Sequence, residues 1–305
     1  MNEIEKNLLA EVADLHEIPE GAYNIRMDGK SAGRNSTAEI QIIPKTDKDG
    51  IEIHIAPNTK KQSVHIPVIL AESGIEETVY NDFYVGENAD VVIIAGCGIH
   101  NCGNQDSSHS GVHTFHLGRN AHVKYVEKHY GEGDGSGARV MNPQTNVYLD
   151  EGASMEMDMS QIRGIDSTNR NTQIHVGDKA EVVLTERLLT HGKQNAESRV
   201  DIFLDGEDSS ARILSRSVGQ DDSVQTFFPC MTGNAKSFGH VQCDSIIMGN
   251  ARISSIPAIR ANSVDAQLVH EAAIGKIAGD QLLKLMTLGL TEEEAEEHIL
   301  NGFLK

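Results

Sequence analysis

Side chains suited to metal chemistry gather in two places, and the first is a cysteine followed downstream by a histidine–glutamate pair. Cys243 lies in the segment Gly-His-Val-Gln-Cys-Asp-Ser, and His270 directly precedes Glu271. Thiolate and imidazole favour zinc, copper or iron–sulfur centres, whereas a carboxylate is a harder ligand. Strand-like alternation groups Cys243 and His270 with apolar neighbours and turns Glu271 to the opposite face. The alternative is a buried structural cysteine and a hydrogen-bonded histidine.

The second place is a run of cysteine and histidine near residue 100. Cys97, His100 and Cys102 follow the pattern Cys-x-x-His-x-Cys, and His113 and His116 lie within reach along the chain. These residues could bind a metal, although the spacing is not that of a zinc finger, because no matching second knuckle follows. His113 and His116 also alternate with apolar residues in a way that suits ordinary strand packing. Metal binding and plain packing both stay open for this run.

The glycine-rich segments do not match nucleotide-binding motifs. The run Gly131–Gly137 lacks the last glycine of the dinucleotide fingerprint, and its carboxylates would repel a pyrophosphate. We expect a flexible surface loop here. Gly275-Lys276-Ile277 is not a phosphate loop, because Ile stands where Ser or Thr is needed. The chain therefore has no ATPase motif of its own.

Composition narrows the classes of partner and compartment. The 305 residues carry a formal net charge of −19 and only four cysteines. Nucleic acids and anionic membrane surfaces bind basic patches, so this charge disfavours both as partners. The acidic start of the chain is unlike a signal peptide, and the longest apolar runs are far too short to cross a bilayer. Four cysteines do not make a secreted disulfide framework. We expect a soluble, cytoplasmic protein with reduced thiols.

Hydrophobic periodicity predicts helices at both ends of the chain. Residues 2–15 have apolar side chains at helical spacing. Residues 280–288 predict a second helix that ends before Gly289, and Thr291 with Glu294 forms a capping box for a third. The expected boundaries are an N-terminal helical segment at 1–22, a β core at 23–271 and a C-terminal helical segment at 272–305.

The middle of the chain contains a weak internal repeat. Stretches 38–43 and 50–55 alternate like half-buried strands, and similar strands continue to about residue 260. Units of strands and turns that recur every 20–50 residues or so predict a mainly β fold with a solenoid core. Chance recurrence of the motif in a β-sandwich is the alternative. Each copy has an apolar residue, a short turn, a small alanine and a strand, with the alanines at Ala89, Ala121, Ala153, Ala180 and Ala251.

This repeat brings the first pair of candidate ligands together. Cys243 and His270 are 27 residues apart, and the first four alanines are 27 to 32 residues apart. The two ligands should therefore lie on neighbouring rungs, about 4.8 Å apart in the strand-pairing direction. A cysteine stacked beside a histidine at that distance could share a metal centre.

The C-terminal third contains an ordered set of motifs: Gln242–Gly249, Ile256-Pro257, Val269–Ala272, Lys276-Ile277, Asp280-Gln281, Gly289–Ala295 and Asn301–Phe303. This set resembles the SufB/SufD family, the scaffold proteins of SUF-type iron–sulfur cluster assembly. The short length is most like the compact SufB-like scaffolds of archaea and bacteria. The resemblance implies a right-handed parallel β-helix flanked by helical ends, which agrees with the repeat. It also implies a homodimer formed through the β-helix, and an ABC-type ATPase, SufC, bound by the C-terminal helices.

The same resemblance assigns roles to individual residues. Cys243 matches the cluster-associated cysteine of the family, and His270 with Glu271 matches its His-Glu pair. Val269 stands where longer SufB proteins often carry a further glutamate, so one carboxylate ligand is missing. Three cysteines have no match to the sulfur-accepting cysteine of the family: Cys97, Cys102 and Cys230.

We therefore expect a non-enzymatic scaffold that holds a transient iron–sulfur cluster on Cys243, His270 and Glu271. It would receive sulfur from a donor and pass the cluster to apoproteins, while the partner hydrolyses ATP. One alternative is a structural adaptor for an ATPase that needs none of its cysteines. The other is a zinc- or iron-dependent enzyme on the solenoid that uses Cys97, His100, His113 and His116.

Overall fold

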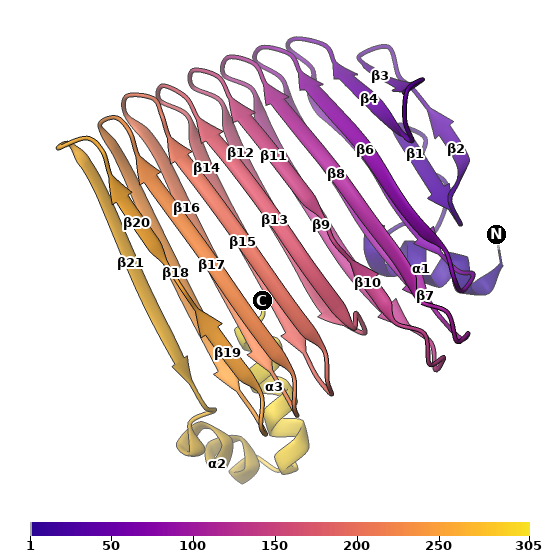
Figure 1. Cartoon of the computed structure of the whole chain (residues 1–305), viewed down its shortest axis with the longest axis vertical. Helices are drawn as coiled ribbons and strands as arrows, with labels where there is room; N and C mark the ends of the chain where they lie inside the picture. The colour runs from indigo at the N-terminus through magenta and orange to yellow at the C-terminus, as the bar shows by residue number, and fades with distance from the viewer. Residues whose placement is uncertain (1) are drawn as a thin grey trace.

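The structure is a stack of β coils whose strands form two sheets that face each other across a narrow core (Figure 1). It is a computed structural model that describes residues 2–305. The predicted β-solenoid core with helices at both ends is confirmed. Sheet A contains, in spatial order, β2 (Lys30–Asn35), β1 (Ala22–Met27), β5 (Lys60–Leu70), β7 (Asp90–His100), β9 (His122–Glu132), β12 (Ser154–Arg163), β14 (Glu181–Thr190), β16 (Ser209–Gly219), β18 (Ser237–Ile247) and β21 (Ala266–Gly275). Sheet B contains β19 (Arg252–Ser255) and β20 (Ala258–Ala261), then β17 (Val224–Gly233), β15 (Asn195–Leu204), β13 (Ser167–Val176), β10 (Arg139–Met141) with β11 (Gln144–Leu149), β8 (Ser107–Leu117), β6 (Glu76–Val85), β4 (Gly50–Ile55) and β3 (Ile40–Pro44).

A recurring turn leads four of the coils from sheet B back to sheet A. A buried alanine, at most 1% exposed, donates its N–H to the carbonyl oxygen three residues earlier. The residue before it has a φ between 54° and 70°, a backbone conformation that favours Asn and Gly. Any larger side chain in place of the alanine would have to displace the packed corner. The turn occurs at Ala89, Ala121, Ala153 and Ala180.

Strand register follows from these turns. His122 pairs with Asp90 on one side and Ser154 on the other, and Ser154 pairs in turn with Glu181. The copy at Ala251 differs from the other four, because it lies between β18 and β19, where the chain passes from sheet A to sheet B. It therefore belongs to the opposite edge of the solenoid.

The N-terminal end of the stack is closed by antiparallel strands. The predicted strands at 38–43 and 50–55 correspond to β3 and β4, which pair as a hairpin with Ile40 opposite Ile55. On the other sheet β1 pairs antiparallel with β2. Ile40 and Ile53 are fully buried. The hairpin thus covers the end of the apolar core, and only the following coils stack in parallel.

The interior divides into an apolar half and a polar half, because alternate residues of every strand point inward. Two neighbouring inward rows of sheet A show the contrast. One row is aliphatic or aromatic and consists of Ile93, Tyr125, Met157, Leu184, Ile213 and Val241. The adjacent row carries charge and consists of Ala95, Glu127, Met159, Glu186, Ser215 and Cys243.

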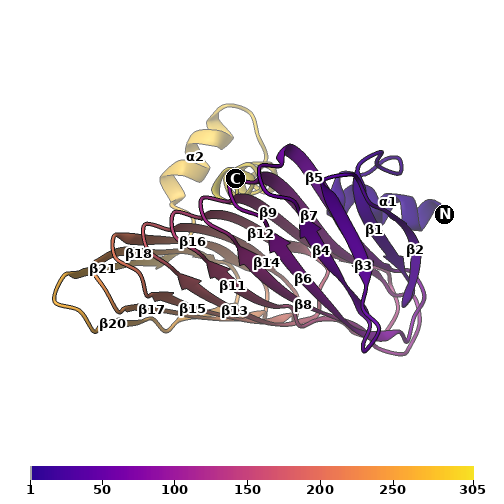
Figure 2. The ribbon, with the colours of Figure 1, turned by 90° about the horizontal axis from the view of Figure 1, so that it is seen from above.

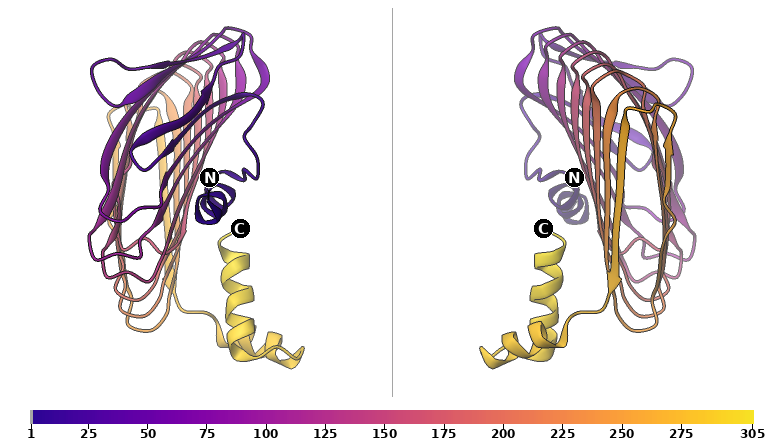
Figure 3. Two further views of the ribbon diagram at one scale, coloured as in Figure 1. Left: turned by 90° about the vertical axis from the view of Figure 1, so that its right-hand side faces the viewer. Right: turned by 90° about the vertical axis from the view of Figure 1, so that its left-hand side faces the viewer.

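Helices from both ends of the chain lie on the outer face of sheet A (Figures 2 and 3). The first, α1 (Glu3–Ala13), packs on β7 at Gly96 and Gly98. A Cβ at Gly96 would lie 2.2 Å from the carbonyl oxygen of Val12, so glycine is required for this close approach. These two glycines flank Cys97 and account for its unusual Gly-Cys-Gly surroundings.

The C-terminal pair consists of α2 (Gly279–Thr287) and α3 (Glu292–Phe303). Leu300 packs with Val218 on sheet A, whereas no residue of α2 is buried. The predicted capping box is present, with Thr291 as the N-cap and Glu294 reaching back to it, and Gly289 has the positive φ expected after a helix end. Within residues 2–305, no helix has the length and apolar character that crossing a bilayer requires.

Candidate metal centre at the end of the solenoid

Cys243 and His270 meet inside the last complete coil. The Cys243 Sγ atom lies 3.7 Å from His270 Nε2. Strands β18 and β21 pair in parallel with Cys243 beside Ala272 and Val241 beside His270. The two ligands are therefore offset by two residues along the strands, and this even offset keeps both on the same inward face. The distance was not predictable from the spacing alone, but the shared face was.

This separation is close to what one metal ion would need. A tetrahedral site with metal–sulfur and metal–nitrogen bonds of about 2.3 and 2.0 Å places sulfur and nitrogen about 3.5 Å apart. The two side chains are already near that distance, at 3.7 Å. A metal could thus be bound with little movement of either strand.

Burial controls the protonation of both groups. Cys243 is 3% exposed, and its burial raises the pKa of the thiol to about 11. Partial burial and the nearby His240 lower the pKa of His270. The imidazole is therefore neutral at pH 7 and has a lone pair to give, whereas the thiol keeps its proton until a cation displaces it.

Glu271 points to the outside of the same strand. Its Oε2 atom lies 3.6 Å from Nε2 of His240 on the outer face of sheet A, and its side chain is 65% exposed. It pairs with Gln242 across the strands. The structure thus brings Cys243 and His270 together and leaves Glu271 on the opposite face, as strand alternation predicts.

A buried ion cluster includes two carboxylates of the interior row that contains Cys243, and sequence reasoning missed it. Arg170, from β13, donates to Glu127 and lies 3.4 Å from Glu186, measured from Nε to Oε1. His129 contacts both Arg170 and Glu127. All four side chains are at most 6% exposed. The signal that could have found them is charge at strand positions whose parity is otherwise apolar.

Burial and charge pairing inside this cluster together shift the pKa values of the two carboxylates in opposite directions. Burial alone would raise the pKa of Glu127, but Arg170 and His129 together lower it well below its ordinary value. Burial raises the pKa of Glu186, and the attraction of Arg170 offsets only part of that rise. Glu186 also accepts a hydrogen bond from Ser198 at 2.9 Å. The interior of the solenoid is thus a polar environment that reaches the candidate metal centre.

Two small cavities lie beside the ion cluster, and Glu186 lines both of them. One cavity is lined by Glu186, Cys243 and several hydroxyl groups, and a second is lined by Arg170 together with Glu186. The hydroxyl groups around Cys243 come from Ser198, Ser215, Ser217, Thr226, Ser245, Ser254 and Ser255. The cavity has a volume of about 10 Å³, so it has room for no more than one water-sized occupant.

The second sequence cluster is divided between the two faces of sheet A. Cys97 is buried and points inward, whereas His100 and Cys102 lie outside, with Cys102 Sγ 3.1 Å from His100 Nε2. His113 is buried in the interior and bonds the Tyr125 hydroxyl group at 2.8 Å. Within residues 2–305, no three His, Cys, Asp or Glu side chains form a group that could hold a metal ion.

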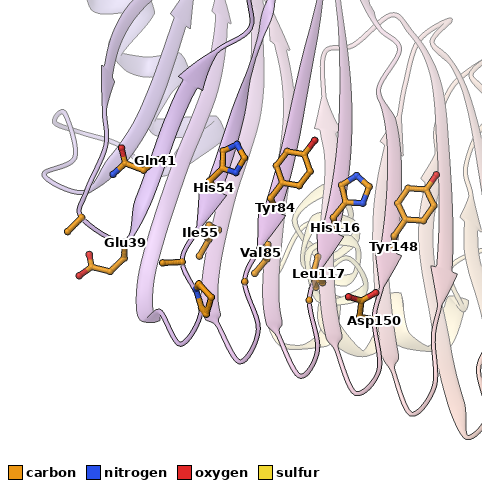
Figure 4. A pocket seen from close by; sticks show the side chains of 15 residues that line it. Glu39, Gln41, His54, Ile55, Tyr84, Val85, His116, Leu117, Tyr148 and Asp150 are labelled. Carbon is orange, nitrogen blue, oxygen red and sulfur yellow. The ribbon is translucent and has the colours of Figure 1, made fainter.

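A wide groove lies far from Cys243, on the outer face of sheet B (Figure 4). It has a volume of about 580 Å³, and four rings of a longer stacked row that runs across the strands line it. Neighbouring ring centroids in the row are 4.8 to 5.4 Å apart, so the inner rings are stacked on both faces. His116 belongs to this row, which puts it on the other side of sheet B from His113. The row is His54, Tyr84, His116, Tyr148, His175 and Phe203.

Comparison with known proteins identifies the family of the chain. The family model described as "SUF system FeS cluster assembly, SufBD core domain" matches residues 76–303. The chain belongs to the SufBD family. The match includes Cys243, His270 and both C-terminal helices. Membership in the SufBD family associates the chain with iron–sulfur cluster assembly.

Individual relatives have low sequence identity to this chain but align with most of its length. An iron–sulfur cluster assembly SufBD family protein of Pyrococcus horikoshii is 28% identical over 285 residues, which is 90% of this chain and 84% of the relative. One from Methanocaldococcus jannaschii is 28% identical over 246 residues, 80% of this chain and 77% of the relative. A longer SufBD protein of Synechocystis is 28% identical over 195 residues, 61% of this chain and 40% of the relative.

Proposed function

We propose that this chain is a scaffold on which an iron–sulfur cluster is assembled and then passed to apoproteins. The observation that carries the proposal is the 3.7 Å separation of Cys243 Sγ and His270 Nε2 on one inward face. Cys243 provides the thiolate and His270 the imidazole to the growing cluster, which is cargo rather than a permanent cofactor. Iron–sulfur clusters are held most firmly by thiolates, so mixed ligation favours release of the cluster.

The candidate metal centre lies at the open end of the solenoid, where a cluster could enter and leave. His270 lies on β21, and within residues 2–305 no further strand pairs with the free edge of β21. A strand edge with unpaired backbone groups is a ready interface for another chain. Val269 and Ile274 add exposed apolar side chains along this strand. We propose that two copies form a homodimer through this end of the β-helix, so that the cluster is built beside the interface.

We also propose that α2 and α3 bind an ABC-type ATPase like SufC. Along α2, the side chains of Leu283 and Met286 are exposed, and Leu288 just beyond it is 76% exposed. The end of α3 is tied to β16, because Arg216 donates to the carbonyl oxygens of Phe303 and Lys305. Strand β16 is the direct neighbour of β18, which carries Cys243. Movement of the helices driven by ATP would thus be transmitted to the cluster site.

Anaerobic reconstitution with ferrous iron and inorganic sulfide tests the ligand assignment. We expect Cys243→Ser and His270→Ala to lose most of the visible absorption of the cluster, and Glu271→Gln to keep it, since Glu271 faces outward. Cys230→Ser is the matched control, because Cys230 is also a buried thiol. The Cys230→Ser protein should form as much cluster as the wild type. Equal yield in the wild type and Cys243→Ser would refute the assignment, and zinc without acid-labile sulfide would favour the enzyme alternative.

Binding of the ATPase is tested separately. The exposed pair Leu283→Ser/Met286→Ser should abolish co-purification with a SufC-like ATPase without changing cluster yield, because neither side chain supports the solenoid. Undiminished co-purification would exclude α2 as the docking helix.

A further inference from the structure

A second reactive site lies on the outside of the solenoid, at the connection between β7 and β8. Cys102 Sγ is 3.1 Å from His100 Nε2. The other ring nitrogen, His100 Nδ1, is 3.2 Å from Glu132 Oε1. Glu132 Oε2 accepts a hydrogen bond from the Tyr130 hydroxyl group at 3.2 Å. The order thiol, imidazole, carboxylate is that of an activated nucleophile, its base and the group that orients the base.

Backbone contacts hold this connection in place. Asn101 is fully buried; its side chain donates to the Gln105 carbonyl oxygen and accepts from the Gly103 N–H, both just after Cys102 in the chain. The glycine-rich run that follows β9 stacks directly on it, and a Cβ at Gly133 would lie 2.3 Å from the Asn101 carbonyl oxygen. The run that sequence analysis assigned to a surface loop thus fixes the nucleophile in its position.

Cys102 differs from the other thiols of the chain in exposure. Of the four cysteines, all within residues 2–305, three are buried and Cys102 is exposed. Burial raises the pKa of Cys97 well above its ordinary value, so this nearby thiol stays protonated and unreactive. Cys102 is therefore the thiol that a soluble reagent or partner meets directly on the outer surface.

A cleft with basic side chains adjoins the site and shares Glu132 with it. The cleft has a volume of about 540 Å³, and its lining includes Arg139, Arg163 and Lys193. Arg139 is paired with Asp166, whereas Arg163 and Lys193 form no ion pair with any residue between 2 and 305. In a chain with a net charge of −19, this gathering of cations is a local exception that suits an anionic ligand.

We propose that Cys102 is the nucleophile that takes up sulfur for this scaffold, from the persulfide of a small thiol that carries carboxylates. The inference rests on the proposed function, because a scaffold for iron–sulfur clusters must receive sulfur in a transferable form. His100 accepts the thiol proton, and Glu132 orients the imidazole. The cleft holds the carboxylates of the donor.

The step is a transfer of one sulfane sulfur without net oxidation. The Cys102 thiolate attacks the outer sulfur of the donor R–S–SH, and a bond forms between Cys102 Sγ and that sulfur. The S–S bond of the donor breaks, and its electron pair goes to the donor sulfur. The donor leaves as R–SH with the proton held by His100. Cys102 is left as a persulfide.

Loading with glutathione persulfide tests the proposal on the full chain. Alkylation, digestion and mass spectrometry should find the extra sulfur on the Cys102 peptide. His100→Gln should slow loading by about 100-fold or more, the usual range for loss of a general base. Glu132→Gln should slow it less and shift the pH profile of alkylation at Cys102, which a structural role alone would not do. Arg163→Gln/Lys193→Gln should raise the donor concentration needed.

The outcomes separate this proposal from the proposed function. Cys102→Ser should lose loading but still form a cluster from inorganic sulfide, whereas Cys243→Ser should load normally and form none. Sulfur on Cys97 or Cys230 instead, or loading unaffected by His100→Gln, would overturn the role of Cys102. Loading by a protein-bound persulfide but not by glutathione persulfide would overturn the small-thiol donor. Thermal unfolding of each variant checks that the solenoid is intact.

Discussion

Removal of Arg170 should unbalance the charged interior of the solenoid. Arg170 is 3% exposed and contacts the two buried carboxylates of Glu127 and Glu186. Methionine in Arg170→Met fills much of the same space, but both carboxylates lose the positive charge that pairs with them. Breaking a buried ion pair on one side costs about 3–5 kcal/mol of unfolding free energy. We expect a loss of that size at pH 7.

The penalty should shrink in acid, because the unpaired carboxylates can then be protonated. Without Arg170, the pKa of Glu127 would rise, and the pKa of Glu186, which burial already raises, would rise further. The folded variant would then bind more protons than the unfolded chain, so its stability falls as the pH rises from about 4.5 towards 7. In the wild type, Glu127 has a lowered pKa, and its contribution is lost as the pH falls through that value.

Urea unfolding followed by circular dichroism at pH 5 and pH 7 measures both effects. The control is Arg170→Met/Glu127→Gln/Glu186→Gln, which removes all three charges and should recover most of the loss at pH 7. If Arg170→Met is as stable as the wild type at pH 7, or if its loss of stability is larger at pH 5 than at pH 7, the pairing of Arg170 with Glu127 and Glu186 is refuted.

Two further changes test other parts of the structure. Burial lowers the pKa of His113 to about 4 from 6.5, so its contribution of about 3 kcal/mol to the unfolding free energy is complete above pH 6.5 and is lost as the pH falls towards 4. The unfolding free energy of His113→Gln should therefore depend less on pH between 4 and 6.5 than that of the wild type. An unchanged slope would be inconsistent with a buried neutral imidazole. Leu300→Ala removes an apolar contact of α3 with Val218 and should weaken the docking of α3 on sheet A by about 2–5 kcal/mol. A glutamate-specific protease should then cleave α3 faster, while the thermal unfolding of the solenoid stays the same. A cleavage rate equal to that of the wild type would show that Leu300 does not anchor the helix.

Local patterns in the sequence were enough to predict the solenoid and its helical ends. The buried alanine after a positive φ recurs because one coil conformation is repeated, so Ala89 and Ala121 could be recognised without coordinates. Thr291 and Glu294 are a local cap, which depends on neighbouring residues only. The shared face of Cys243 and His270 followed from strand parity. Each of these features depends on short-range geometry.

Features that depend on long-range packing were not predictable in the same way. Arg170 comes from sheet B and Glu127 from sheet A, 43 residues apart, and no local pattern indicates that they meet. His100 and Cys97 are close in sequence but face opposite sides of sheet A. Glu132, which completes the outer site with His100, is one coil further along the chain. Such contacts require the register of the stacked coils.

The central claim is that Cys243 and His270 ligate the same cluster, and pulsed electron paramagnetic resonance of the reduced cluster tests it most directly. Protein labelled with ¹⁵N-histidine should show a strong nitrogen coupling, and the residual cluster that His270→Ala still forms should show none. His240→Ala is the matched control, since His240 lies nearby on the outer face, beside Glu271. The account predicts that His240→Ala keeps the coupling. A coupling that survives in His270→Ala, or none in the wild type, would contradict it.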